Sequence, residues 1–305
     1  MYQVREAIPG VFEVALELGE DPVGFFGGGP IAYSLWFLRG PSAAIIDPGP
    51  TTVATVGLQA IRDLGYDPSE VEYVVPTHIH VDHGGACGYL VQELPRAKAV
   101  IHARGAEHAR DPSRLIAGTA AVFGERWQDL FGAILPVPEE RLLVVEDGDA
   151  LVMGGRRHRV VYLPGHAPHH IGIYDEEMGA IYCGHGLGMP RPGSPLPDPP
   201  STLPFFDVDA ALASIAKVRD LNPRYIFYSH YGLGGADPRA EIDTAERVTR
   251  EMGEIVTRGM AEGASPEEME RRLAAYVYGE ASVASRTFAP IVRAYMTYFQ
   301  RKAAR

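Results

Sequence analysis

The chain has little of what a secreted or membrane-spanning protein requires. It contains 2 cysteines in 305 residues, Cys87 and Cys183, too few for a disulfide framework, so we expect reduced thiols. No segment reaches the roughly 18 uncharged apolar residues that span a bilayer. The N-terminal residues also lack a basic start followed by an apolar run. The sequence therefore predicts a cytoplasmic protein with no membrane partner.

Positive charge is also in short supply. The chain has 28 Lys and Arg against 39 Asp and Glu, a formal net charge of −11 at pH 7. Residues 235–305 contain 11 residues of each sign, so the acidic excess lies in residues 1–234. Such a surface repels phosphate backbones, which argues against nucleic acid and favours a small-molecule substrate. No Gly-x-Ser-x-Gly segment occurs, which argues against a serine hydrolase.

Short β-branched runs alternate with helical patterns along the first 235 residues. Helices are expected over residues 53–64 and 209–221. Strands are expected at residues 32–38, 43–47, 71–75, 98–102, 142–145, 159–163, 171–174, 180–183 and 224–229. Strand meanders mixed with crossover helices predict an α/β or α+β sandwich.

Two insertions interrupt this pattern. Residues 104–133 are expected to be helical, with Phe123, Trp127 and Phe131 as an apolar stripe at i, i+4 and i+8. Such a stripe usually serves packing, and it would also suit the roof of a pocket. Residues 186–206 contain 7 prolines and cannot form a regular element. A loop of this length is usually functional or disordered.

Residues 236–305 form a second predicted unit, a helical extension of residues 1–235. Ser-Pro-Glu-Glu at residues 265–268 has the features of a helix start, and a last helix is expected to begin near Pro290. We expect these helices to cover the edge of the site or to form a homodimer contact. Their buried faces are predicted to contain Ile242, Ala245, Val248, Met252, Ile255, Met260, Ile291, Tyr295, Tyr298 and Phe299.

Three of the 11 histidines fall within six positions of the segment VVPTHIHVDHGG, residues 74–85. His78 and His80 are two apart, so at a strand end they point the same way, and Asp82 and His83 follow in the turn. Neutral imidazoles with one carboxylate suit zinc or iron, whereas calcium and magnesium prefer oxygen ligands. The competing interpretation is a polar turn with incidental histidines. The density of ligand-type side chains favours a metal site.

The segment THIHVDHGG resembles the signature of the metallo-β-lactamase superfamily, and further motifs follow in the family's order. IIDPG at residues 45–49 is similar to its early Asp-x-Gly turn, LPGHAPHHIGIY at 163–174 to its Pro-Gly-His motif, and YSHYG at 228–232 to its final ligand motif. The resemblance covers about residues 10–234 and points to the glyoxalase II-like or lactonase-like branch. It implies a four-layer αββα sandwich with a metal site at one edge.

The same resemblance implies two divalent metal ions, with zinc predicted and iron or manganese as alternatives. The first ion would be held by His78, His80 and His166. The second ion would be held by Asp82, His83 and His230.

The resemblance fails at one position. Where the family has Gly-Asp, with a carboxylate that bridges both metals, residues 184–185 are Gly-His. A carboxylate offers two oxygens to two cations, whereas one imidazole nitrogen ligates only one, and a negative charge is lost. His185 would therefore bind the second metal terminally, leave one site weak so that the centre is mononuclear, or point away from the site.

Other residues are expected in supporting positions. The resemblance places Asp47 and His170 behind the ligands, and His169 at the surface or in the pocket wall. Tyr231, next to His230, is a candidate catalytic donor to a developing oxyanion. Structural roles are predicted for His102, His108 and His158, and burial for the thiols of Cys87 and Cys183.

The resemblance implies hydrolysis by metal-bound hydroxide, with Asp82 orienting the hydroxide and later receiving its proton. An apolar lid around Phe123 and Trp127 favours a thioester, ester or lactone of a small or acyl substrate. One alternative is an iron-dependent oxidoreductase of the same fold acting on oxygen or persulfides, which a nitrogen-rich site would suit. Another is a weakly catalytic binding module, given the lost bridging carboxylate.

Overall fold

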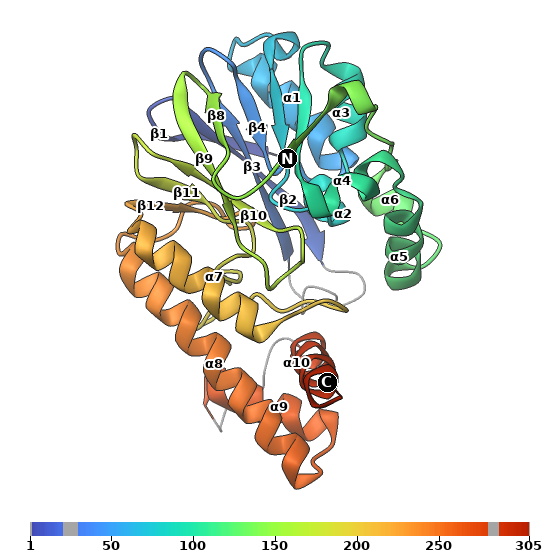
Figure 1. Ribbon diagram of the computed structural model, residues 1–305, viewed down its shortest axis with the longest axis vertical. Coiled ribbons are helices and arrows are strands. Elements are labelled where there is room, and N and C mark those ends of the chain that lie inside the picture. The colour runs from blue at the N-terminus through green and yellow to red at the C-terminus, as the bar shows by residue number, and fades with distance from the viewer. Residues whose placement is uncertain (1, 21–29, 280–286, 305) are drawn as a thin grey trace.

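Two β-sheets lie face to face at the centre of the protein, and helices cover their outer faces (Figure 1). The computed structural model describes residues 2–20, 30–279 and 287–304. Buried apolar side chains form one layer between the sheets and one layer under the helices on each side. The predicted αββα sandwich is therefore confirmed.

The larger sheet has seven strands in the order β1-β2-β3-β4-β5-β6-β7. Neighbours pair antiparallel from β1 to β4 and parallel from β4 to β7. Parallel neighbours need crossover connections, which α1 (Thr51–Asp63) and α3 (Cys87–Glu93) supply on either side of β5. The strands are β1 (Tyr2–Ile8), β2 (Val11–Glu20), β3 (Pro30–Leu38), β4 (Ala44–Ile46), β5 (Tyr73–Val75), β6 (Lys98–His102) and β7 (Leu142–Val145).

The smaller sheet has five strands in the order β12-β11-β10-β9-β8. Its pairs are antiparallel except β11 with β12, which are parallel and joined through α7 (Val208–Leu221). The strands are β8 (Ala150–Met153), β9 (Arg156–Tyr162), β10 (Ile171–Asp175), β11 (Ala180–Tyr182) and β12 (Tyr225–Phe227). Short helical turns at Pro68–Glu70 and Glu139–Arg141 precede β5 and β7.

Aromatic side chains join the two sheets near one end of the sandwich. The rings of Trp36 on β3 and Phe227 on β12 lie 4.5 Å apart, and Trp36 Nε1 donates a hydrogen bond of 2.9 Å to the carbonyl of Tyr228. The backbone of Ser34 donates to the carbonyl of Ser229 at 2.8 Å. These contacts fix the segment after β12, which carries His230, against the larger sheet.

All nine strands expected from β-branched runs are present within a few residues, but β1, β2 and β8 were not predicted. β2 carries Glu13 and β1 alternates exposed polar with half-buried residues, which weakens their apolar pattern. Glu13 is nevertheless buried, because Ser34 donates a hydrogen bond of 2.7 Å to its carboxylate and Arg5 pairs with it. Tertiary partners, not local composition, stabilise these strands.

The insertion at residues 104–133 is helical, but the single aromatic stripe predicted there is wrong. The structure has three helices, α4 (Ala103–Arg110), α5 (Ser113–Phe123) and α6 (Trp127–Phe131). Gly124, with φ of +73°, ends α5 between Phe123 and Trp127. The three aromatic residues still meet, because α5 and α6 fold back on each other and pack over Val81 of α2 (Val81–Gly84).

Three helices complete the described chain, α8 (Pro238–Glu262), α9 (Pro266–Tyr278) and α10 (Ala289–Ala303). Ser265 caps α9 by accepting the backbone N–H of Glu268 at 3.2 Å, and α10 begins next to Pro290, both as predicted. No helix among the described residues is long and apolar enough to cross a bilayer. The division at residue 235 remains a prediction, since the first turns of α8 pack on the smaller sheet through Ile242 and Ala245.

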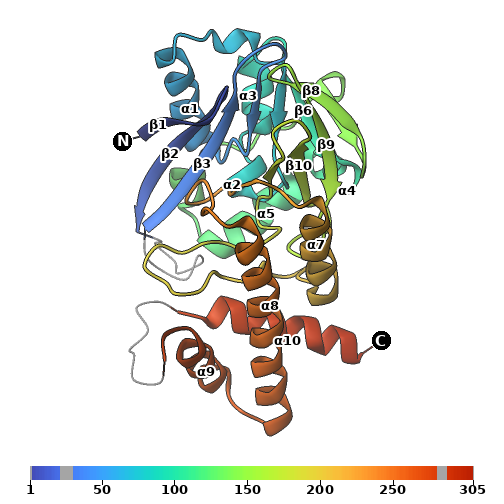
Figure 2. The same ribbon diagram turned by 90° about the vertical axis from the view of Figure 1, so that its left-hand side faces the viewer.

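The end of the proline-rich loop links these helices to the sandwich. Arg301 of α10 donates hydrogen bonds to the carbonyls of Pro204 and Phe206, and Phe206 is buried among the C-terminal helices. The next residue, Asp207, donates its backbone N–H to the carbonyl of Gly165 at 2.9 Å. Figure 2 shows α8 extending from the sandwich, with α9 and α10 packed against its far half. The C-terminal helices thus reach the turn that carries His166.

Deletion of the chain after residue 235 should lower the melting temperature sharply or make the protein insoluble. The deletion uncovers Ile226 and Val218, which α8 covers, and exposing each such side chain costs about 1.5–3 kcal/mol. A shorter deletion after residue 262 keeps this cover and should cost less. Thermal unfolding and sedimentation of both variants measure the effect. A 1–235 variant that is soluble, monomeric and equally active would contradict both predicted roles of the helices.

Candidate metal centre

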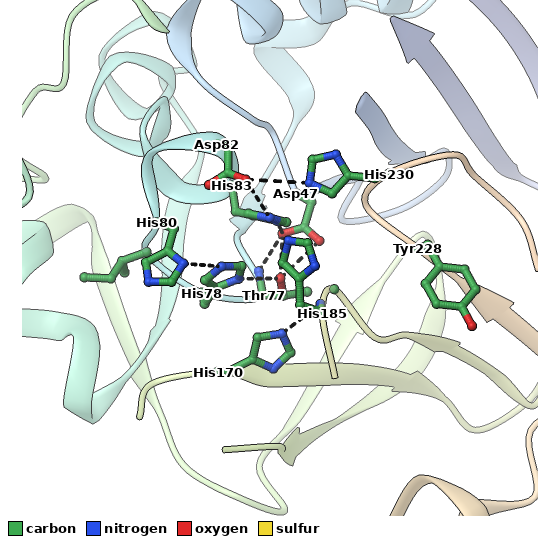
Figure 3. A network of polar contacts seen from close by, with 12 residues as sticks. Asp47, Thr77, His78, His80, Asp82, His83, His170, His185, Tyr228 and His230 are labelled. Carbon is green, nitrogen blue, oxygen red and sulfur yellow. Dashed lines mark hydrogen bonds and ion pairs between the residues drawn. The ribbon is translucent and has the colours of Figure 1, made fainter. Parts of the chain in front are cut away.

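The predicted ligands converge at one edge of the sandwich, because each follows the end of a strand at that edge. His78 and His80 follow β5, His166 follows β9, His185 follows β11 and His230 follows β12. Asp82 and His83 lie in α2, directly after the β5 ligands. Figure 3 shows six of these side chains gathered at this edge, those of His78, His80, Asp82, His83, His185 and His230. Segments far apart in the chain therefore form one site.

Three imidazole nitrogens face each other in the first cluster. His80 Nδ1 lies 3.0 Å from His78 Nε2 and 3.1 Å from His166 Nε2. Nitrogens around a tetrahedral ion with bonds of 2.0–2.1 Å are separated by roughly 3.3 Å. The opposite nitrogen of His78 lies 3.2 Å from the hydroxyl of Thr77, which holds the ring in place. Two separations in the predicted first ligand set, from His80 to His78 and from His80 to His166, are thus close to the spacing around one small cation.

A carboxylate and two imidazoles form the second cluster. Asp82 Oδ2 lies 3.4 Å from His83 Nε2 and 3.6 Å from His230 Nε2. His230 Nδ1 donates a hydrogen bond of 2.9 Å to the carbonyl of Ala32. This bond turns Nε2 of the same ring toward the Asp82 oxygen, where a cation between the two atoms would bind both.

His185 lies among both clusters. Ligand atoms of Asp82, His83, His185 and His230 lie within 4.8 Å of one another, and so do those of His78, His166 and His185. The ring of His185 stacks on that of His166 at 4.4 Å and on that of His230 at 5.1 Å. The interpretation in which His185 points away from the site is therefore wrong.

A match to a family model decides the family. Residues 28–230 match the model described as the metallo-beta-lactamase superfamily. The chain belongs to the metallo-beta-lactamase superfamily. The match covers about two thirds of the chain and ends at His230, so α8 to α10 lie outside it.

Named relatives within the superfamily include hydrolases. The chain is 30% identical over 161 residues to N-acyl homoserine lactonase AttM of Agrobacterium fabrum, covering 51% of this chain and 50% of the relative. It is 27% identical over 146 residues to the hydroxyacylglutathione hydrolase of Synechococcus sp., covering 48% and 44%. The chain thus spans about half the length of these relatives, or less.

A solved structure is similar over nearly the whole chain. The metallo-beta-lactamase family protein TTHA1429 from Thermus thermophilus matches with a TM-score of 0.71 and 21% sequence identity. The match covers 98% of this chain and 96% of that one. At this identity the likeness shows the fold, including its C-terminal part.

The turn that carries His185 has its own supports. Gly184 has φ of +50°, and a Cβ there would lie 2.3 Å from the Thr77 hydroxyl and 2.8 Å from His170 Nε2. The backbone N–H of His185 donates to His170 Nε2 at 3.1 Å. Glycine at 184 and the ring of His170 together hold His185 in the site, and His170 lies behind the ligands as predicted.

Asp47 also lies behind the ligands. Its carboxylate accepts hydrogen bonds from the backbone of Thr77 at 2.7 Å and from its hydroxyl at 2.9 Å, and lies 3.3 Å from His83 Nδ1. Burial would raise the pKa of Asp47, but His83 and Thr77 outweigh it and lower that pKa. A carboxylate behind a ligating histidine orients the ring and keeps the proton on the far nitrogen.

The ionisation of the histidines follows the two clusters. Burial, with repulsion from neighbouring rings, holds the pKa values of His78, His166 and His185 well below the usual range. They are therefore neutral, the form that binds metal. Burial also opposes protonation of His83, but the carboxylates of Asp82 and Asp47 outweigh it and raise the pKa of His83 to about 10.

The remaining histidines lie outside the two ligand clusters. His169 is buried in the wall of the site, with its ring stacked 6.2 Å from that of His78. His102 caps α4 and stacks on Tyr162 at 4.4 Å, and His158 is buried 3.5 Å from Asp175. His108 lies half-buried on α4. Cys87 and Cys183 are buried, as predicted, and burial raises the pKa of both thiols.

Sequence reasoning missed Thr77 and a buried ion pair beside Tyr231. Arg191 Nε lies 2.8 Å from Asp198, and Arg191 Nη1 donates to the Tyr231 hydroxyl at 3.4 Å. Arg191 and Asp198 are the only charged residues in the segment 186–206. Their opposite charges could have predicted the ion pair from the sequence. The catalytic role of Tyr231 remains a prediction, as does the ligand role of each histidine.

Removal of metal by a chelator should lower the melting temperature by several degrees. Binding to the folded chain alone adds RT ln(1 + [L]/Kd) of stability, about 2.7 kcal/mol when the free ion is at 100 times its Kd. Calorimetry before and after dialysis against a chelator, with elemental analysis of both samples, measures the change. An unchanged melting temperature after proven metal loss would contradict a stabilising metal centre.

Proposed function

We propose that this chain is a metal-dependent hydrolase of thioester, ester or lactone bonds in a small or acyl substrate. The observation that supports it most directly is the pair of adjacent ligand clusters, three imidazoles in one and a carboxylate with two imidazoles in the other. The relatives are named as an N-acyl homoserine lactonase and a hydroxyacylglutathione hydrolase, and these names suggest carbonyl substrates.

The donor chemistry fits two borderline cations, for which we propose zinc. His78, His80 and His166 would hold one ion, and Asp82, His83 and His230 would hold the other. We propose His185 as a terminal ligand of the second ion. Bound divalent ions would lower the pKa of water and polarise a substrate carbonyl.

The chain's own residues would orient the reaction. Asp82 Oδ2 lies between His83 and His230, where it would orient the attacking water and accept its proton. The Tyr231 hydroxyl accepts a hydrogen bond from Arg191, and we propose this hydroxyl as a donor to the developing oxyanion. Asp47, Thr77 and His170 hold the ligand rings in these positions.

Hydrolysis of a panel of acyl thioesters, aryl esters and lactones by the zinc-loaded protein tests the proposal. We expect turnover that a chelator abolishes and added zinc restores. His108→Ala changes a histidine outside both clusters and serves as the control for loss of a ligand. No turnover of any of the three bond types by fully loaded protein would contradict the proposal and favour a binding module.

The nitrogen-rich donor set supports a second candidate, an iron-dependent oxidoreductase. Of the seven predicted ligand side chains, six are imidazoles and one is a carboxylate. Imidazole suits iron as well as zinc. Protein purified without added metal would then contain iron and consume oxygen or oxidise persulfides. Zinc in that preparation, with no oxygen consumption, would exclude this candidate.

A further inference from the structure

Helix α5 presents an uncharged apolar surface to solvent. From Leu115 to Phe123 its sequence is LIAGTAAVF, nine residues without a charge. Thr119 is the buried residue of this helix, and Val122 is 49% exposed. A surface helix ordinarily places charged side chains outward and apolar ones inward. The exposed residues of this stretch are Ala117, Gly118, Ala121 and Val122, so α5 turns small or apolar residues, and no charge, toward solvent there.

The apolar cluster that α5 joins is unusually open. Its buried members are Val81, Trp127, Phe131 and Ile134, and its partly buried members are Leu115, Ile116, Ala120, Phe123 and Leu130. In every other apolar cluster of the described residues, buried members outnumber partly buried ones. We call Leu115, Ile116, Ala120, Val122, Phe123 and Leu130 the α5–α6 patch. It has the character of a binding surface more than of a core.

The apolar cluster that contains most of the patch also contains a residue from the turn of the metal centre. Val81 lies between His80 and Asp82 in the chain and is 6% exposed. It packs in the same cluster as Trp127, whose helix also carries Leu130 of the patch. Figure 1 shows α5 and α6 beside α2 at the same edge of the sandwich. A substrate whose carbonyl lies at the metal centre would thus have an apolar surface next to it.

We propose that the α5–α6 patch binds the alkyl part of the substrate's acyl chain, an inference that rests on the hydrolase function proposed above. The charge of the surface points to this occupant. The chain carries a net charge of −11, yet residues 115–123 carry none, and the charges of Arg126 and Asp129 beside Leu130 pair with each other at 2.8 Å. An uncharged chain of methylene groups gains free energy there with each group that leaves water.

The first test compares two matched valines. Val122 in the patch and Val152 on β8 are similarly exposed, 49% and 54%, and β8 pairs with the start of β9, away from His166. We expect kcat/KM of the zinc-loaded protein to rise by roughly two- to fourfold per methylene from acetyl to decanoyl thioesters. Val122→Asp should flatten this dependence, and Val152→Asp should leave it unchanged. Equal chain-length dependence in the three proteins would overturn the proposal.

The second test does not require turnover, so it separates this inference from the hydrolase proposal. Trp36 is fully buried between the sheets, whereas Trp127 lies under the patch. Tryptophan fluorescence of the full chain should therefore respond to N-methyldecanamide, an uncleavable alkyl amide, and much less to N-methylacetamide. Ile116→Ser and Val122→Asp should each weaken the response at least several-fold, and Val152→Asp should not.

Three outcomes of the second test are decisive. Binding of the long amide without any ester turnover would keep the alkyl site and contradict the hydrolase. Turnover of short esters without binding of the long amide would contradict the alkyl site alone. Concentration-dependent dimerisation that Val122→Asp abolishes, with no response to the amide, would show that a second copy covers the patch and would overturn the proposal.

Discussion

Replacing His80 by alanine should remove most of the bound metal and nearly all hydrolysis. His80 Nδ1 faces the nitrogens of both His78 and His166 at 3.0–3.1 Å, so its loss leaves two ligands where the centre needs at least three. Changes behind metal ligands cost 10- to 100-fold in affinity or activity, and loss of a ligand should exceed that range. Elemental analysis and kcat/KM of the purified variant measure both effects.

His108→Ala provides the matched control for this variant. His108 lies on α4, half-buried and outside both clusters, so metal content and activity should stay at the wild-type level. A His80→Ala protein with full metal occupancy would refute the ligand assignment. A His80→Ala protein that keeps its metal but loses activity would place His80 in substrate binding.

Replacing His185 by alanine should remove the second metal ion preferentially and keep the ion on His78, His80 and His166. His185 lies among the ligand atoms of Asp82, His83 and His230, and as a terminal ligand it would supply one nitrogen to that ion. His185→Asp would supply a carboxylate with two oxygens and a negative charge in place of one nitrogen, and should tighten binding of the second ion by at least tenfold, about 1.4 kcal/mol. Activity need not rise, because a bridging carboxylate also neutralises charge that would activate water.

Metal stoichiometry and competition titrations of wild type, His185→Ala and His185→Asp, purified in the same way, measure this effect. Loss of both ions from His185→Ala would instead assign His185 to the shared centre, which its place in both clusters also allows. If the three proteins bind the same ions with the same affinity, His185 is not a ligand. Its stacking on His166 and His230 would then be a packing role.

Short-range patterns predicted much of the site, and long-range contacts account for what was missed. His78, His80, Asp82 and His83 lie in one turn, so their spacing alone brought them together. The distant predicted ligands, His166 and His230, came from motif resemblance, because no local pattern shows which strands end at one edge. The place of His185 in both clusters depends on Gly184 and His170, a three-dimensional fit that sequence spacing does not reveal.

The errors in the fold have the same origin. Phe123, Trp127 and Phe131 do have helical spacing in the sequence, but Gly124 adopts a positive φ and ends α5. The three aromatic residues therefore meet between two packed helices and not along one helix. β2 was missed because Glu13 interrupts its apolar run, and only the partners Ser34 and Arg5 make that carboxylate tolerable inside the protein. Tertiary neighbours overrode local preference in each case.

The attachment of α10 to the proline-rich loop has a consequence for how the protein loses its order. Arg301 holds the carbonyl of Phe206, and Asp207 holds the carbonyl of Gly165, one residue before His166. If the clusters bind metal, detachment of α10 would loosen a ligand, and loss of the metal would in turn favour detachment of α10. Coupling of this kind is reciprocal. Every increment of free energy that an ion contributes to the folded turn would then also oppose fraying and proteolysis at the distant C-terminus.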